Sequence, residues 1–170
     1  MRTAVFIDGH WLHKTSAALG FDVDFKRLHA WYEDHETCSI EYFAIEATRP
    51  DGTSTVRKLL DWLECNGFRV RSISVDIDQR DSIRDTRSEM MVWLALSMVN
   101  AAERGIERID LWTNDRSMIR AVSAAQQSGA FVTLVAEFSN CPGTLMRAAD
   151  SFVEIADIKV EIMQPKKVVA

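Results

Sequence analysis

The sequence lacks the features that are typical of membrane, secreted and nucleotide-binding proteins. No run of about 18 apolar residues occurs, so a membrane span is not expected. The opening segment, MRTAVFIDGH, becomes acidic too early for a secretory signal, and a cytoplasmic location is therefore expected. No glycine-rich loop follows the first apolar segment, since Asp8-Gly9-His10 stands there instead. This absence disfavours a nucleotide-binding Rossmann domain.

Cysteine is scarce, and its spacing excludes the common metal and redox motifs. Cys38, Cys65 and Cys141 stand far apart, and no pair has the two-residue spacing of a zinc or redox site. Free, buried thiols are expected instead. His10 and His13 could share one face of a helix, which leaves metal ligation by histidine as an alternative.

Length and composition indicate one globular domain. The chain has 170 residues, of which 47% are hydrophobic, enough to build a buried core. We expect a domain over residues 1–158 and a tail over 159–170. The net charge of −5 argues against strong nonspecific attraction to a polyanion, although a basic face can exist on an acidic chain.

Short apolar segments rich in β-forming residues alternate with segments of helical spacing. This alternation and the short connections predict an α/β fold, a parallel sheet with helices on both faces. A loop is predicted over 78–87, a buried methionine-rich helix over 88–103, and an edge strand over 159–163. Exposed apolar surface on that helix would favour a homodimer. The strands are predicted at residues 3–7, 39–47, 68–77, 108–113, 130–136 and 151–155.

Acidic residues follow several of the predicted strands, where ligands of open parallel sheets bind. Asp8 follows the first strand, and Asn114 and Asp115 follow the fourth. A lone aspartate there is often only a turn residue or helix cap, but two at equivalent positions indicate a site. Carboxylates gathered in one place repel each other unless a cation compensates, and Mg²⁺ or Mn²⁺ suits oxygen ligands. Glu89 opens the methionine-rich helix, and Asp150 precedes the last strand.

Three segments in this order, VFIDGHWLH, LWTNDRSMIRAV and AADSFVEI, resemble the NYN branch of the PIN-like ribonucleases over nearly the whole chain. The resemblance implies a Rossmann-like PIN-type sheet and metal-dependent cleavage of single-stranded RNA by an activated water. Its implied catalytic residues are Asp8, Glu89, Asp115 and Asp150, of which the first three would bind Mg²⁺ or Mn²⁺.

The sequence also departs from the family pattern. Ser117 stands where the second acid of the turn is usual, and Trp11 replaces a common asparagine. Arg84 or Arg87 is the nearest counterpart of a lysine before the helix acid. These departures keep open a second hypothesis, a catalytically degenerate NYN fold that serves as an RNA-binding or protein-interaction module.

Residues beside the acids are candidates for binding RNA. Arg116 and Arg120 lie one helical turn apart next to Ser117, where guanidinium groups could bind phosphate. Trp11 could stack on an unpaired base, whereas Trp112, inside a strand, is expected in the core.

Overall fold

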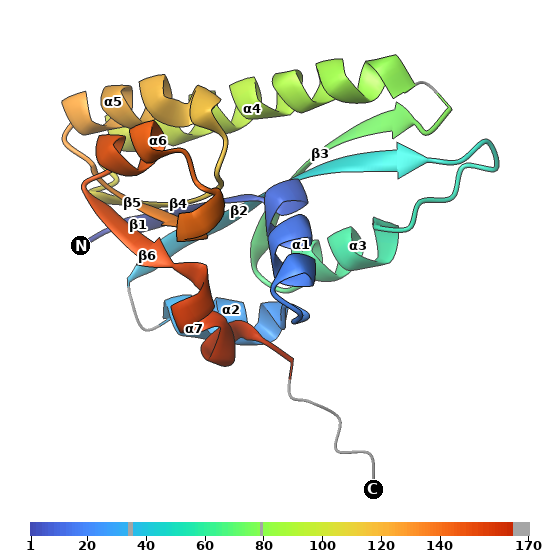
Figure 1. Cartoon of the computed structure of the whole chain (residues 1–170), viewed down its shortest axis with the longest axis horizontal. Helices are drawn as coiled ribbons and strands as arrows, with labels where there is room; N and C mark the ends of the chain where they lie inside the picture. Colours follow the sequence, from blue (N-terminus) through green and yellow to red (C-terminus); the bar gives the residue numbers. More distant parts are fainter. Residues whose placement is uncertain (34–35, 79, 165–170) are drawn as a thin grey trace, which may run out of the picture.

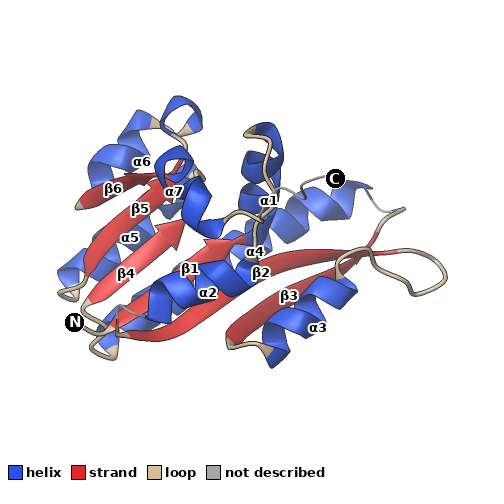
Figure 2. Cartoon of the chain, turned by 90° about the horizontal axis from the view of Figure 1, so that it is seen from below, coloured by secondary structure: helices blue, strands red, loops and turns tan. Residues whose placement is uncertain are grey.

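All strands of the part of the chain that the structure describes belong to one parallel sheet. The structure is a computed structural model and describes residues 1–33, 36–78 and 80–164. The strand order is β3-β2-β1-β4-β5-β6 (Figure 2), which confirms the predicted α/β class. The strands are Thr3–Asp8 (β1), Thr37–Thr48 (β2), Phe68–Asp76 (β3), Arg108–Trp112 (β4), Phe131–Ala136 (β5) and Ser151–Glu154 (β6).

Helices form a layer on each face of this sheet. In Figure 1 the helices α4, α5 and α6 lie above it, and α2, α3 and α7 lie below, while α1 follows the carboxyl end of β1. The α-helices are Gly9–Ala18 (α1), Phe25–Glu33 (α2), Arg57–Cys65 (α3), Arg80–Glu103 (α4), Ile119–Gln127 (α5), Gly143–Ala148 (α6) and Ile155–Ile162 (α7). Two short 3₁₀ turns are Arg116–Met118 (η1) and Phe138–Asn140 (η2).

Strands are added to the sheet on one side of β1 up to β3, and on the other side of β1 from β4 onward. The first three strands run outward from β1 to one edge, and α4 then returns the chain to β4, on the other side of β1. Ligands of doubly wound sheets bind at such a switch point, beyond the carboxyl ends of the two central strands. The topology therefore places the residues after β1 and β4 side by side.

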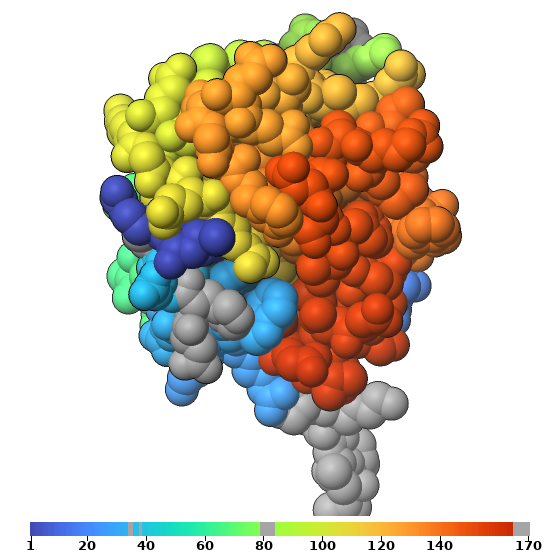
Figure 3. Space-filling view, turned by 90° about the vertical axis from the view of Figure 1, so that its left-hand side faces the viewer, coloured from blue at the N-terminus to red at the C-terminus, as the bar shows by residue number. Residues whose placement is uncertain are grey.

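The core lies on both faces of the central strands. Every residue of β1 is buried, as expected for a central parallel strand. Phe6 and Phe43 meet on the α4 face, and Tyr42 packs edge-on against Phe25 on the other. Figure 3 views the molecule from the side where the N-terminus lies. The Arg2 carbonyl accepts hydrogen bonds from the Glu107 and Arg108 N–H groups.

The methionine-rich helix contributes its methionines to this core. Met90, Met91 and Met98 are all at most 5% exposed, so they offer no free face for the predicted homodimer. The exposed apolar side chains of α4 are instead Val92 and Leu96.

Two local predictions were wrong because polar contacts, which hydrophobic periodicity does not reveal, extend the helices. Helix α4 begins at Arg80 inside the predicted loop 78–87, and its first turns pack on the sheet through Arg87. The predicted edge strand 159–163 is instead the end of α7, because the Glu154 carboxylate caps this helix by accepting from the Ala156 N–H. The end of the predicted tail, 165–170, lies outside the described residues.

Two simpler expectations have clear outcomes. The Cys141 thiol is buried as predicted, and burial raises its pKa to about 11, whereas Cys65 is exposed and contradicts the prediction. The side chain of Cys38 lies outside the part of the chain that the structure describes.

Among the described helices, none has the length and apolar character that crossing a membrane requires.

A buried polar network joins α2 to β4 on the face opposite α4. The indole N–H of Trp112 donates to the hydroxyl of Tyr32 at 2.8 Å, and that hydroxyl donates to the Asp110 carboxylate at 3.1 Å. Burial, followed by the negative charge of Asp110, raises the pKa of Tyr32 well above its usual value, so the hydroxyl keeps its proton. Trp112 is therefore a core residue, as expected.

Removing the Tyr32 hydroxyl should destabilise the fold. In Tyr32→Phe the buried Trp112 N–H and the Asp110 carboxylate both lose a partner, so the free energy of unfolding should fall by about 1–3 kcal/mol in urea titrations. Tyr42→Phe is the matched control, because no hydrogen bond of the Tyr42 hydroxyl to a described residue is present, and its cost should be smaller. Equal costs for the two variants would contradict this account.

Candidate functional site

The carboxylate of Asp8, the last residue of β1, is the centre of the site at the switch point. It is 1% exposed, and each of its oxygens accepts two hydrogen bonds. Oδ1 accepts from the Trp11 N–H at 3.2 Å, which caps α1, and from Nη1 of Arg87 at 2.7 Å. Oδ2 accepts from Nη2 of Arg87 at 2.6 Å and from the Thr113 hydroxyl at 2.9 Å.

Asp115 lies beside Asp8, as its place after β4 led us to expect. Its Oδ1 accepts from the Ser117 N–H at 2.9 Å and caps η1, while its own N–H donates to the Thr113 hydroxyl at 3.1 Å. Its Oδ2 is 3.4 Å from Nη2 of Arg87, the same nitrogen that binds Asp8. One guanidinium group therefore joins both carboxylates.

The structure does not bring Glu89 to these acids. Arg87 faces the sheet, and a residue two positions further along a helix points roughly 200° away from it. Glu89 is accordingly exposed, with no contact to Asp8 or Asp115 among the described residues. The side chain at the helix position that the family resemblance assigns to an acid thus points to solvent.

Asp150 lies at the opposite end of the sheet. Its Oδ2 accepts from the Val132 N–H at 2.8 Å and from the Gln126 side chain at 3.1 Å. Val132 is the second residue of β5, and Asp150 precedes β6, so both mark the amino ends of the strands. Asp150 links β5, β6 and α5 and stands apart from the switch point.

The residues present do not fit a divalent metal while Arg87 holds this position. Within residues 1–33, 36–78 and 80–164, no group of three or more His, Cys, Asp or Glu side chains could hold a metal ion. The guanidinium lies against the Asp8 oxygens that a metal would need. Burial alone would lower the pKa of Arg87, but the hydrogen bonds and charge of Asp8, followed by Asp115, raise it above its usual value. The positive charge at the site is therefore permanent.

A cleft of about 530 Å³ opens beside Arg87 at the carboxyl ends of the strands. His10 and Lys14 reach it from one face of α1, four residues apart. The pKa of the His10 imidazole is lowered by partial burial and then by the Arg87 charge, so His10 is neutral at pH 7. The lining residues are His10, Trp11, Lys14, Thr15, Ala18, Arg87, Asn114, Glu137 and Asn140.

The predicted RNA-binding residues have mixed positions. Trp11 lines the cleft but is only 4% exposed, so little of its indole is open to a base. Arg116 and Arg120 are exposed at the start of η1 and α5, and neither lines the cleft. Ser117 contributes its backbone N–H to Asp115 and is also exposed.

Comparisons with known proteins agree with this fold. The model of the NYN domain matches residues 2–156. The chain belongs to the NYN domain family. A protein of unknown function from Vibrio parahaemolyticus has a similar crystal structure, with a TM-score of 0.70, 21% identity and 96% of each chain covered. No curated protein matches the chain.

Membership in the NYN family indicates a PIN-like nuclease fold. Nucleases of this family generally use divalent metals and act on RNA. In the present NYN domain a guanidinium group contacts both Asp8 and Asp115, the acids that follow β1 and β4.

Sequence reasoning missed three features of the site of this NYN domain. The sequence pattern indicated Arg87 only as a possible counterpart of a family lysine, and it did not indicate the Thr113 hydroxyl as part of the site. Lys14 was also missed, although its position four residues after His10 on the helix that follows Asp8 was a usable signal.

Replacing Arg87 should destabilise this NYN domain at neutral pH. Arg87→Met leaves the buried Asp8 carboxylate without its counter-charge and next to Asp115, so the free energy of unfolding should fall by about 2–4 kcal/mol. Arg84→Met removes an exposed arginine from the same helix and should change little. Equal costs for Arg87→Met and Arg84→Met would contradict this role of Arg87.

Proposed function

We propose that this NYN domain binds single-stranded RNA in the cleft at the carboxyl ends of β1 and β4 and does not hydrolyse it. The observation that carries this proposal is the bidentate contact of Arg87 with Asp8, at 2.6 and 2.7 Å. The permanently charged Arg87 guanidinium lies where a catalytic metal of the family would be expected to bind.

Binding to RNA is supported by the chemistry of the cleft. Lys14 supplies positive charge, while the charge of Arg87 offsets that of Asp8, and contacts to the phosphate backbone supply most of the affinity in RNA binding. Asn114 and Asn140 provide amide groups, and the Asn114 side chain donates to the Asn140 carbonyl at 3.0 Å. Arg116 and Arg120, exposed nearby, can extend the phosphate contact beyond the cleft.

The absence of hydrolysis is supported by the number of acids at the site. Asp8 and Asp115 stand together, whereas Glu89 points to solvent and Asp150 lies at the other end of the sheet. Ser117, where a further acid is usual, has a neutral hydroxyl. A guanidinium that contacts both carboxylates and offsets half of their charge leaves them little affinity for a divalent ion.

RNA binding should depend on Lys14. Lys14→Gln removes one cation from the cleft and should weaken binding of a labelled oligoribonucleotide several-fold in fluorescence anisotropy. The slope of log K against log salt should also fall by about 0.7, the value for one phosphate contact to a single strand. Lys58→Gln, an equal change of charge at an exposed lysine of α3 that does not line the cleft, should leave both quantities unchanged. The cleft is not the RNA site if the two variants behave alike.

A second candidate function is the metal-dependent ribonuclease that the family membership suggests. The observation in its favour is that one nitrogen of Arg87 contacts both Asp8 and Asp115, so the two carboxylates lie within reach of a single cation. It requires Arg87 to leave them, and Asp8 and Asp115 would then hold Mg²⁺ or Mn²⁺.

Cleavage and metal binding separate the two candidates. With labelled single-stranded RNA and either Mg²⁺ or Mn²⁺, the wild-type protein should release no fragments beyond those of a no-protein control. Calorimetry with Mn²⁺ should show no binding to wild type but measurable binding to a double variant, Arg87→Gln with Ser117→Asp, which frees Asp8 and restores the missing acid. Metal-dependent cleavage by wild type that is lost in Asp8→Asn would establish the second candidate and overturn the first.

A further inference from the structure

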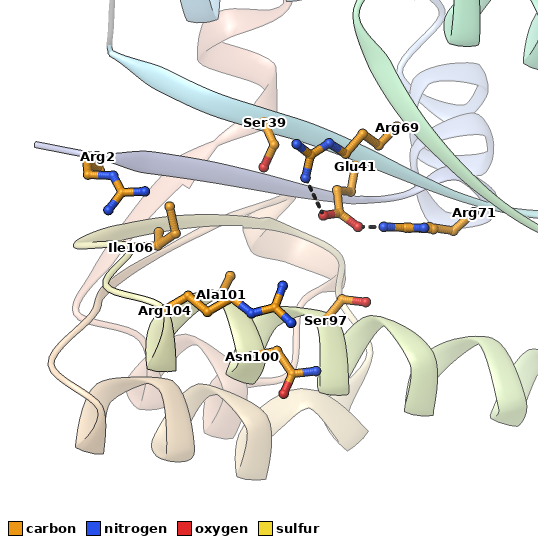
Figure 4. Close-up of a pocket in the computed structure, with 10 residues that line it drawn as sticks. All are labelled: Arg2, Ser39, Glu41, Arg69, Arg71, Ser97, Asn100, Ala101, Arg104 and Ile106. Atoms are coloured by element: carbon orange, nitrogen blue, oxygen red, sulfur yellow. Dashed lines mark hydrogen bonds and ion pairs between the residues drawn. The ribbon is translucent and has the colours of Figure 1, made fainter.

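A second cavity, with four arginines among its ten lining residues, lies at the amino ends of the strands between the sheet and the C-terminal half of α4 (Figure 4). Its volume of about 400 Å³ is within the range of roughly 300–1,000 Å³ that is typical of small-molecule sites. Ser97, its first lining residue on α4, lies ten residues after Arg87, about 15 Å along the helix. The cavity is therefore distinct from the cleft. Its lining residues are Arg2, Ser39, Glu41, Arg69, Arg71, Ser97, Asn100, Ala101, Arg104 and Ile106.

One buried carboxylate positions two of the four arginines. Glu41 on β2 is 7% exposed and accepts a hydrogen bond from Nε of Arg71 at 3.1 Å. Arg69, its neighbour in register on β3, lies 3.8 Å from its other oxygen. The Arg71 guanidinium also lies over the ring of Trp93, 5.9 Å from the ring centre. Both cations are thus held before any ligand arrives.

The other two arginines leave positive charge uncompensated. In the described part of the chain, no hydrogen bond or ion pair engages the guanidinium of Arg2 or Arg104. The nearby Glu107 accepts from the backbone N–H of Arg2 rather than from its side chain. Four cations therefore face one carboxylate, and Figure 4 shows the guanidinium group of Arg104 between α4 and the strands, on the side of Glu41.

This arrangement selects the chemistry of the ligand. Guanidinium groups bind phosphate oxygens with paired hydrogen bonds, and several of them around one cavity fit a group with two or more negative charges. Ser39, Ser97 and Asn100 add neutral polar groups, whereas only Ala101 and Ile106 are apolar. A lipid chain or another apolar ligand would find little surface to bury here.

We propose that this arginine cavity binds a phosphorylated ligand of about nucleotide size, either free in solution or as the phosphorylated end of an RNA chain. Arg2 and Arg104 contact its phosphates, while Glu41 holds Arg69 and Arg71 in place. This site is additional to the cleft at the carboxyl ends of the strands and does not depend on RNA binding there.

Calorimetry tests this proposal. The probes are inorganic pyrophosphate, ADP and two matched tetraribonucleotides, one with a 5′-phosphate and one with a 5′-hydroxyl. Wild type should bind at least one phosphorylated probe, and Arg2→Gln and Arg104→Gln should each weaken that binding about tenfold or more. Arg49→Gln, an equal change at an exposed arginine outside both cavities, should bind as wild type does. Binding of pyrophosphate or ADP identifies a free ligand, and binding restricted to the 5′-phosphorylated RNA identifies a chain end.

Two results would overturn the proposal. One is the absence of binding to any phosphorylated probe by the folded wild-type protein. The other is equal affinity in Arg2→Gln, Arg104→Gln and Arg49→Gln, with unchanged thermal melting showing that all three are folded. Lys14→Gln separates the two sites, because it changes the RNA cleft and should leave pyrophosphate binding at the arginine cavity unaffected.

Discussion

The contact between Arg87 and Asp8 is the interaction on which the centre of this molecule depends. The Asp8 carboxylate accepts hydrogen bonds from the start of α1, from α4 and from the loop after β4. Three elements far apart in sequence therefore meet at one buried charge. Such a charge is costly to bury unless a partner of opposite sign and sufficient hydrogen bonds accompany it. Arg87 supplies both, and one of its nitrogens also lies 3.4 Å from the adjacent Asp115 carboxylate.

The same contact decides what the site can do. A divalent metal and a guanidinium group both neutralise carboxylates, but only the metal activates a bound water for attack on phosphorus. With Arg87 in place, the open cleft at the carboxyl ends of β1 and β4 is lined by the Lys14 ammonium group and by the amide groups of Asn114 and Asn140. That combination suits the binding of a phosphate backbone. The fold of a nuclease family is thus compatible with a protein whose site binds RNA without cleaving it, as the proposed function has it.

Helix α4 supports both candidate sites of the molecule. Its N-terminal half directs Arg87 to the switch point, and its C-terminal half lines the arginine cavity through Ser97, Asn100 and Arg104. Between them, Met90, Leu94 and Met98 pack against the sheet as a buried stripe. A parallel sheet has chemically different ends, so one helix that spans it can serve an acidic site and a basic site at once.

The sequence by itself determined the α/β class, the parallel sheet and the meeting of Asp8 with Asp115. Alternation of strands and helices is a local property, and equivalent strand ends must lie together in a parallel sheet. Only the tertiary structure decided which side of α4 faces those acids. Val92 and Leu96 are as apolar as the buried stripe, so hydrophobicity did not reveal the rotation of the helix. A shift of two residues turns a side chain by roughly 200°, which separates a buried Arg87 from an exposed Glu89.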